Sequence, residues 1–227
     1  MLIKVCGLRD PENIRAVEAL GVDLMGFIFC PTSPRYVSMM PSHSGIIPDH
    51  AACGFENGGK PMRVGVFVDD MAQNIITRVY NFRLDYIQLH GSETATAIDN
   101  LRRTIDPDIH PGIKIIKTIS VGQADDISKW RDYKGHADML LFDTKCATHG
   151  GSGGKFDWSL ISSYDGDIPF LISGGIGPED APALCAFHHK MFAGIDINSR
   201  FETSPGVKDV SKIATFINYI RSHAPNI

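Results

Sequence analysis

The sequence has no long apolar run and no large excess of charge of either sign. A membrane-spanning helix needs about 20 consecutive apolar residues, and no stretch of the 227 residues approaches that length. The N-terminal residues also lack the apolar segment of a secretory signal. The formal net charge is −4, and no basic stripe is present that could neutralise the phosphates of a nucleic acid. We therefore expect a cytoplasmic protein that binds neither membrane nor nucleic acid.

Cysteine and histidine are present, but not at the spacings of a metal site or a disulfide framework. The five cysteines include no C-x-x-C pair, and the nine histidines include no H-E-x-x-H motif. Structural and catalytic zinc sites are recognised by such spacings. We expect reduced thiols and no bound metal.

Short apolar runs recur along the chain at roughly the length of one strand-and-helix unit. The runs are continuous rather than alternating, which is typical of strands buried on both faces by helices. The length suits one barrel-sized α/β domain or two small domains. The predicted strands are residues 2–6, 24–29, 63–68, 86–89, 113–118, 139–142, 170–173 and 193–197.

Helical segments are predicted between these strands, and two intervening stretches are irregular. Residues 39–62 are rich in Pro, Gly and Ser and predict an irregular excursion with a short helix at most. Residues 144–155 are dense in glycine, and we expect a loop that closes over a ligand. The predicted helices are residues 11–20, 72–82, 94–104, 123–133, 157–163, 178–187 and 207–223.

Three helix-to-strand junctions place an aspartate just before the next strand, at Asp23, Asp85 and Asp138. In a parallel barrel these junctions lie on the face that serves stability rather than catalysis. We interpret the three aspartates as folding signals.

The opposite ends of the strands carry most of the chemically reactive side chains. In a parallel barrel the residues just past the carboxyl end of each strand gather on one face, which holds the active site. The pattern therefore predicts an enzyme. The residues at these ends are Cys6, Gln88, His90, Asp143, Gly174, Gly175, Asp196 and Ser199.

The loops after the seventh and eighth strands favour phosphate binding. Gly174 and Gly175 leave backbone N–H groups unobstructed, and Asp196, Asn198 and Ser199 follow the next strand. Many eight-stranded barrels bind a phosphate with these two loops. Glycine pairs also serve simply to turn a strand into a helix, but two such loops in these units favour the phosphate interpretation.

Cys6 and Asp143 are candidates for a base and an acid. They end strands that are not neighbours, so they would face each other across the barrel mouth. A carboxylate after an apolar run is partly buried, and burial favours the protonated form of an acid. Cys6 as a base needs a lowered pKa or a positive neighbour, and we expect Lys4 to point away from it. Two plainer interpretations remain open: a small buried hydrophobe for Cys6, and a helix cap or ion-pair partner for Asp143.

Arg35 lies in the loop after the second strand, and its guanidinium suits a substrate carboxylate. An isolated loop arginine is more often just solvated. Gln88 and His90 would be polar groups in an otherwise apolar mouth.

These residues stand in motifs that together resemble the phosphoribosylanthranilate isomerase family of tryptophan biosynthesis. Each motif is weak by itself, but they follow one another in order over nearly the whole chain. The motifs are KVCGL at 4–8, GFIF at 26–29, SPRYV at 33–37, VGVFV at 64–68, QLHG at 88–91, FDTK at 142–145, FDW at 156–158, SGG at 173–175 and SPGVKD at 204–209.

The resemblance implies a single (β/α)8 barrel (TIM barrel) over residues 1–227 and an Amadori rearrangement of a phosphosugar that bears anthranilate. It implies Asp143 as general acid, Cys6 as general base and Arg35 as the group that binds the anthranilate carboxylate. Gly174, Gly175 and Ser199 match the phosphate loops, with Asp196 and Asn198 beside them. No cofactor is implied, and the protein would be a monomer or a homodimer.

Arg200 departs from the family pattern, which often has glycine at this position. It requires a backbone without positive φ, or strain there. Three alternatives remain: another phosphosugar barrel such as an indole-glycerol-phosphate synthase or a ribulose-phosphate epimerase, a silent phospho-ligand-binding barrel, and a second aminoaldose substrate. The first two enzymes rely on lysine and glutamate, or on paired aspartates with a metal, which the strand ends here do not supply.

Overall fold

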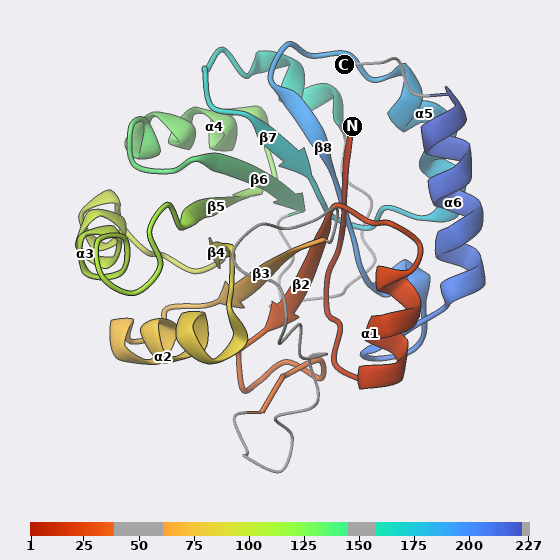
Figure 1. Cartoon of the computed structure of the whole chain (residues 1–227). Coiled ribbons are helices and arrows are strands. Elements are labelled where there is room, and N and C mark those ends of the chain that lie inside the picture. The colour runs from red at the N-terminus through yellow and green to blue at the C-terminus, as the bar shows by residue number, and fades with distance from the viewer. Residues whose placement is uncertain (39–60, 145–157, 224–227) are drawn as a thin grey trace.

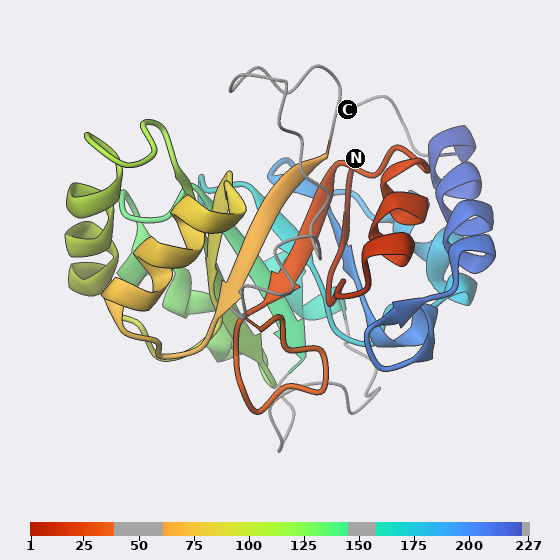
Figure 2. The ribbon, with the colours of Figure 1, turned by 60° about the horizontal axis from the view of Figure 1, so that its bottom comes forward.

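The computed structural model describes residues 1–38, 61–144 and 158–223. Parallel strands close into a barrel in the order β1 to β8, with helices around the outside (Figures 1 and 2). The predicted parallel (β/α)8 barrel is thereby confirmed. The strands are β1 (Leu2–Val5), β2 (Leu24–Ile28), β3 (Met62–Phe67), β4 (Tyr86–Leu89), β5 (Lys114–Val121), β6 (Met139–Thr144), β7 (Phe170–Ile172) and β8 (Phe192–Ile197).

The helical layer contains both α-helices and short 3-10 segments. Local signals set several helix starts: the side chain of Asp10 accepts a hydrogen bond from the amide of Asn13, and Thr94 accepts one from Ala97. The α-helices are α1 (Pro11–Glu18), α2 (Ala72–Phe82), α3 (Ala95–Ile105), α4 (Ala124–Ile127), α5 (Ala181–Ala186) and α6 (Val210–His223). The 3-10 segments are η2 (Ser128–Tyr133), η3 (Trp158–Ser163), η4 (Pro178–Asp180) and η5 (Ser199–Phe201).

The segment after β8 differs from the prediction. Residues 207–223 were expected to form one helix, but a small antiparallel hairpin, β9 (Glu202–Ser204) and β10 (Val207–Lys208), precedes α6. Gly206 has φ +85°, and its amide donates to the Glu202 carboxylate at 3.1 Å. The turn therefore delays the helix to Val210. The predicted excursion at 39–62 and loop at 144–155 lie almost entirely outside the described residues.

The barrel interior is apolar at one end and polar at the other. Side chains alternate along each strand between the inside and the outside of the barrel, and an apolar cluster contributed by the strands alone fills the barrel interior. Farther along the same strands, Lys4, Gln88 and Thr118 are buried. A larger cluster packs the helices on the barrel exterior. The interior cluster comprises Leu24, Val64, Ile116, Met139, Leu141 and Leu171.

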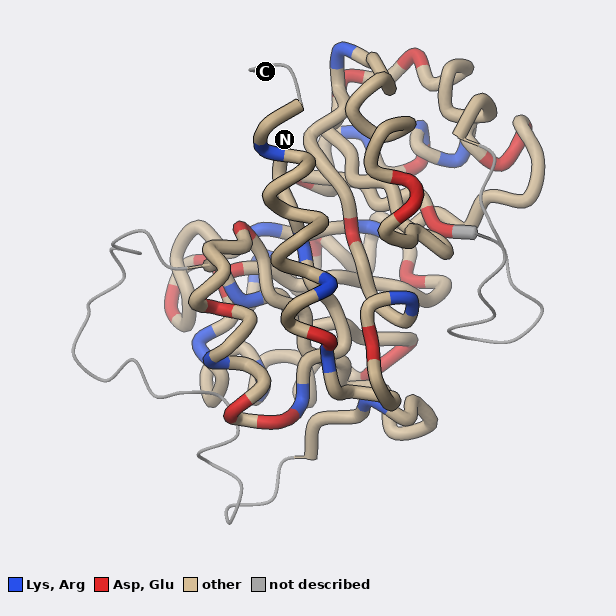
Figure 3. The backbone as a smooth tube through the Cα atoms, turned by 90° about the vertical axis from the view of Figure 1, so that its right-hand side faces the viewer, with Lys and Arg blue, Asp and Glu red and all other residues tan. Residues whose placement is uncertain are grey.

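Charges of both signs are interspersed along the described backbone, as Figure 3 shows. None of the described helices is long and apolar enough to cross a membrane.

The three junction aspartates each bind the backbone of the neighbouring strand. Asp23 accepts a hydrogen bond from the amide of Ile3 at 2.8 Å. In the same way, Asp85 accepts from Arg63 at 2.7 Å, and Asp138 from Ile115 at 2.8 Å. Each carboxylate therefore satisfies an amide where an adjacent strand begins, which supports their interpretation as folding signals.

We expect Asp23→Ala to lower the free energy of unfolding by about 1–3 kcal/mol, because the amide of Ile3 loses a charged acceptor. Urea unfolding followed by circular dichroism measures the change. Asp108→Ala, at an exposed position, is the matched control and should differ from the unsubstituted protein by less than about 0.5 kcal/mol. Equal effects of the two substitutions would contradict the role assigned to Asp23.

Candidate active site

The carboxyl ends of the strands bring together ionisable side chains that lie far apart in the sequence. Cys6 and His90 follow β1 and β4, Asp143 lies in β6, and Asp196 lies in β8. Nε2 of His90 is 3.3 Å from Oδ2 of Asp143. Asp196 interacts electrostatically with Cys6, Asp143 and His90. Groups from four separate strands therefore share one site.

The thiol of Cys6 is buried beside β2, on the same face of β1 as Lys4. Its exposed fraction is 4%. A Cβ atom on Gly26 would lie 2.7 Å from Sγ, so this glycine makes room for the thiol. Lys4 acts electrostatically on Cys6 and lowers the pKa of its thiol. The prediction that Lys4 points away is wrong, because residues two apart in a strand share a face.

Burial raises the pKa of the Cys6 thiol above its ordinary value. Lys4 is the strongest influence in the opposite direction, Asp196 adds to the rise, and Lys208 opposes it. The free protein therefore does not have the lowered thiol pKa that a base could use. The thiol does have two positively charged neighbours, Lys4 and Lys208, and a positive neighbour was the alternative requirement stated for Cys6 as a base.

Lys4 and Asp196 form an ion pair inside the barrel. Nζ of Lys4 lies 2.9 Å from Oδ1 of Asp196, and the two side chains are 0% and 7% exposed. Burial alone would lower the pKa of Lys4, but Asp196 and Cys6 raise it above its usual value. Lys4 is therefore a charged ammonium in this interior. Ser173 Oγ donates to the other carboxylate oxygen of Asp196 at 3.4 Å.

Asp143 belongs to a chain of polar side chains that crosses from β6 to β5. Its carboxylate is partly buried, at 22% exposure, and contacts His90. The other ring nitrogen of His90 is 3.2 Å from Nε2 of Gln88, which also contacts Oγ1 of Thr118 at 3.3 Å. Gln88 and Thr118 are buried. This series of contacts holds the ring of His90 beside the carboxylate of Asp143.

Arg35 is held by a second buried network rather than solvated. Nε and Nη2 donate to the two oxygens of Glu202 at 2.8 and 2.7 Å. These hydrogen bonds raise the pKa of Arg35. Nζ of Lys208 donates to Glu202 at 2.6 Å and to Oδ1 of Asn198 at 2.7 Å. The loop after β2 is thereby tied to the β9–β10 hairpin.

Gly7 allows the side chains of Arg35 and Asn198 to pack closely against the loop after β1. Its φ is +76°, and a Cβ there would lie 2.6 Å from Cδ of Arg35 and 2.7 Å from Oδ1 of Asn198. A side chain at this position would displace both groups.

The loops after β7 and β8 have the geometry expected of an anion site. Gly174 and Gly175 have φ of +91° and +66°. Within the described residues their amides donate no hydrogen bond. Ser199 opens η5 in the adjacent loop. Free amides at glycines suit an anion because no side chain blocks the approach.

Arg200 connects these two loops through an ion pair with Glu179. Its backbone is not among the positive-φ residues, so arginine stands at this position without that strain.

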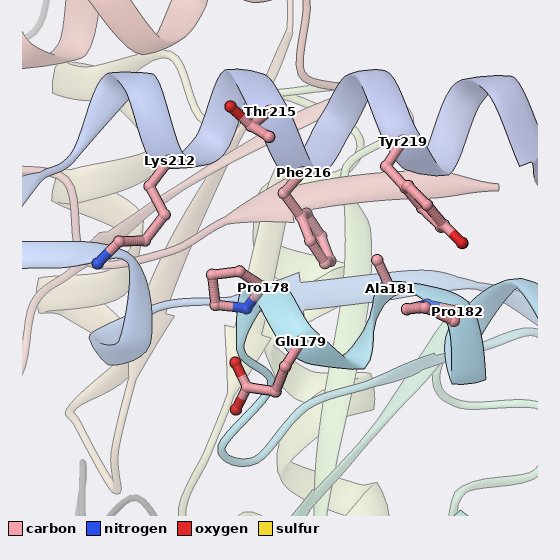
Figure 4. Close-up of a pocket in the computed structure, with 8 residues that line it drawn as sticks. All are labelled: Pro178, Glu179, Ala181, Pro182, Lys212, Thr215, Phe216 and Tyr219. Carbon is pink, nitrogen blue, oxygen red and sulfur yellow. The ribbon is translucent and has the colours of Figure 1, made fainter.

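A separate groove lies outside the barrel between α6 and the η4–α5 segment, as Figure 4 shows. Phe216 and Tyr219 point from α6 toward Pro178, Ala181 and Pro182. This groove is a helix–helix packing surface and contains none of the strand-end candidates.

A closed parallel barrel with thiol, carboxyl, imidazole and guanidinium groups at the carboxyl ends of its strands defines an enzyme of the (β/α)8-barrel class. The family model described as N-(5'phosphoribosyl)anthranilate (PRA) isomerase matches residues 3–219. The chain belongs to this family and is an isomerase.

Individual relatives agree over nearly the full length. The N-(5'-phosphoribosyl)anthranilate isomerase of Parabacteroides distasonis is 41% identical over 97% of this chain and 93% of its own. That of Phocaeicola vulgatus is 42% identical over 97% and 98%. A crystal structure of phosphoribosyl anthranilate isomerase in complex with reduced 1-(o-carboxyphenylamino)-1-deoxyribulose 5-phosphate is 27% identical, with TM-score 0.77, over 98% and 99%.

Sequence reasoning missed the roles of Lys4, Lys208 and Glu202 in the site. Strand alternation would have found Lys4, which lies two residues before Cys6. Lys208 stands in the SPGVKD motif, but no local pattern indicates its contact with Glu202 or that of Glu202 with Arg35, because the fold brings the β9–β10 hairpin to the loop that carries Arg35.

We expect Gly26→Ala to lower kcat at least about tenfold, because the new methyl group would displace the thiol and backbone of Cys6. Gly65→Ala is the matched control: its methyl would overlap Leu84 and Phe67 instead. Both variants should lose about 1–3 kcal/mol of stability by overpacking, and only the first should lose turnover. An equal fall of kcat in the two variants would show that Gly26 has no specific role in leaving space for the Cys6 thiol.

Proposed function

We propose that this isomerase converts N-(5'-phosphoribosyl)anthranilate to 1-(2-carboxyphenylamino)-1-deoxyribulose 5-phosphate in tryptophan biosynthesis, with Asp143 as general acid and Cys6 as general base. The observation that carries the proposal is the position of Cys6 after β1 and of Asp143 in β6, at the carboxyl ends of two strands that are not neighbours. Asp196 of β8 interacts electrostatically with both. The product analogue bound to the solved relative matches this substrate class.

The acid step opens the sugar. Asp143 in its protonated form gives its proton to the ribose ring oxygen as the bond from that oxygen to C1 breaks. The lone pair of the anthranilate nitrogen forms the C=N bond of a Schiff base. His90, 3.3 Å away, supports the carboxylate that remains.

The base step moves the double bond. Cys6 as thiolate takes the proton from C2, the electrons of the broken C–H bond form a C1=C2 bond, and the C=N electrons return to nitrogen. The resulting enolamine becomes the aminoketone when C1 is protonated and the C2 hydroxyl loses its proton. The aldimine nitrogen accepts the electrons, so these steps balance without a further reactant.

The remaining residues orient the substrate. Arg35 would bind the anthranilate carboxylate through Nη1, since Glu202 accepts from its other two donors. Gly174, Gly175 and Ser199 would bind the phosphate, with Asn198 and Asp196 beside them. Two anionic anchors at opposite ends would hold C1 and C2 between Asp143 and Cys6.

We expect Cys6→Ser and Asp143→Asn each to lower kcat at least about a hundredfold, because each removes one proton transfer. The loss of anthranilate fluorescence measures turnover, with substrate generated by a separate transferase and a no-enzyme control for its spontaneous decay.

Both variants should still bind reduced 1-(o-carboxyphenylamino)-1-deoxyribulose 5-phosphate, which shows that the site is intact. Near-normal turnover in either variant would remove that residue from the mechanism. If the folded, unsubstituted protein does not accelerate the reaction, the proposed reaction is wrong and the site only binds a phosphosugar.

We expect Arg35→Ala to weaken binding of the same product analogue about 10- to 100-fold, because a charged hydrogen bond to its carboxylate is lost. Ribose 5-phosphate, which lacks the carboxylate, is the control ligand and should bind both proteins equally. Calorimetric titration gives both dissociation constants. An equal loss for the two ligands would mean that Arg35 supports the loop and does not bind the carboxylate.

A further inference from the structure

Lys4 is a buried charge that the proposed proton transfers do not use. Its side chain is fully buried inside the barrel, where Nζ donates to Asp196 at 2.9 Å. The strand register pairs these two residues directly. Cys6 follows Lys4 by two positions on the same face of β1, and the ammonium lowers the pKa of the thiol against the effect of burial. One ammonium thus lies between a carboxylate and a thiol.

Other charged groups also face Cys6, but they have other partners. Lys208, from β10, donates to Asn198 and Glu202. Arg35, from the loop after β2, donates two hydrogen bonds to Glu202. Both cations act on Cys6 through space. On the far side, His90 of the β4 loop and Asp143 of β6 act on Asp196 through space. Within the described residues, Lys4 is the cation with the largest effect on the pKa of the Cys6 thiol.

Stability alone gives little reason for this arrangement. A buried ion pair is often no more stabilising than apolar side chains of the same volume, and the barrel interior next to it is filled by such side chains. A charge that is held at this cost, on the same strand face as the Cys6 thiol, points to a chemical use.

We propose that Lys4 is a positioning residue, the counter-ion that Cys6 shares with Asp196, and that it stabilises the thiolate before the C2 proton is removed. This inference rests on the proposed role of Cys6 as base. When the thiolate is present, the ammonium balances two anions. After the proton has moved to sulfur, the ammonium and Asp196 remain a neutral pair. The carboxylate of Asp196 offsets part of the positive charge of Lys4 and so weakens its stabilisation of the thiolate. Lys4 without Asp196 would stabilise the thiolate more.

The two partners therefore have opposite effects on Cys6, which a merely structural role would not produce. Lys4→Met removes the cation and leaves the Asp196 carboxylate, so the apparent pKa of Cys6 should rise by about 1 to 3. Asp196→Asn keeps the size of the side chain and frees the ammonium for sulfur, so the pKa should fall.

The measurement is a pH titration of the ultraviolet absorbance of the thiolate in the full-length protein, with the same titration of a Cys6→Ala variant subtracted. Lys117→Met is the matched control, since Lys117 is also a buried, paired lysine, and its hydrogen bonds within the described part of the chain go to Leu89, Gly91 and Glu93 and not to Cys6. It should leave the titration of Cys6 unchanged. In the active enzyme, the acidic limb of the kcat profile should move in the same direction as the thiol.

An unchanged thiol pKa in Lys4→Met, or a shift in the same direction for both substitutions, would overturn the proposal. If Lys4→Met does not fold, Asp196→Asn decides: a fall supports the proposal, and a rise or no change refutes it. The titration needs no substrate, so a failure of the proposed reaction would show in the fluorescence assay and leave this result separate.

Discussion

Strand β1 pairs with β8 over four registered positions, and this pairing closes the barrel and places Lys4 beside Asp196. The two strands approach so closely that a Cβ atom on Gly194 would lie 2.0 Å from the carbonyl oxygen of Leu2. Cys6 continues from β1 on the same face, and Asn198 follows β8. The proposed base, its proposed counter-ion and one side of the predicted phosphate site therefore depend on the pairing of the first and last strands.

Two buried charge networks act electrostatically on Cys6. One runs from Ser173 through Asp196 to Lys4, and the other from Arg35 through Glu202 to Lys208. In both, carboxylates balance cations that are largely or fully buried, so the charges are held in place before any ligand arrives. Preorganised charge of this kind is the usual means by which an enzyme stabilises ions that form during a reaction.

Much of the fold follows from local pattern. Continuous apolar runs predict β1 to β8 within a few residues because strands covered on both faces are mostly apolar. The junction aspartates were recognisable by their repetition, and α2 begins and ends where periodicity places it. The helix predicted at 207–223 was too long, because a hairpin stabilised by Glu202 and Gly206 has no apolar period to reveal it.

The sequence by itself determined the parallel barrel, the side of it that holds the chemistry, and the family, since each is encoded in short ordered motifs. Only the tertiary structure decided which charges meet. The ion pairs of Lys4 with Asp196 and of Arg35 with Glu202 join residues 192 and 167 positions apart. No local pattern reports such a distance, because barrel closure and the β9–β10 hairpin bring these side chains together only after the chain has folded. The electrostatic surroundings of Cys6 are therefore a property of the closed barrel.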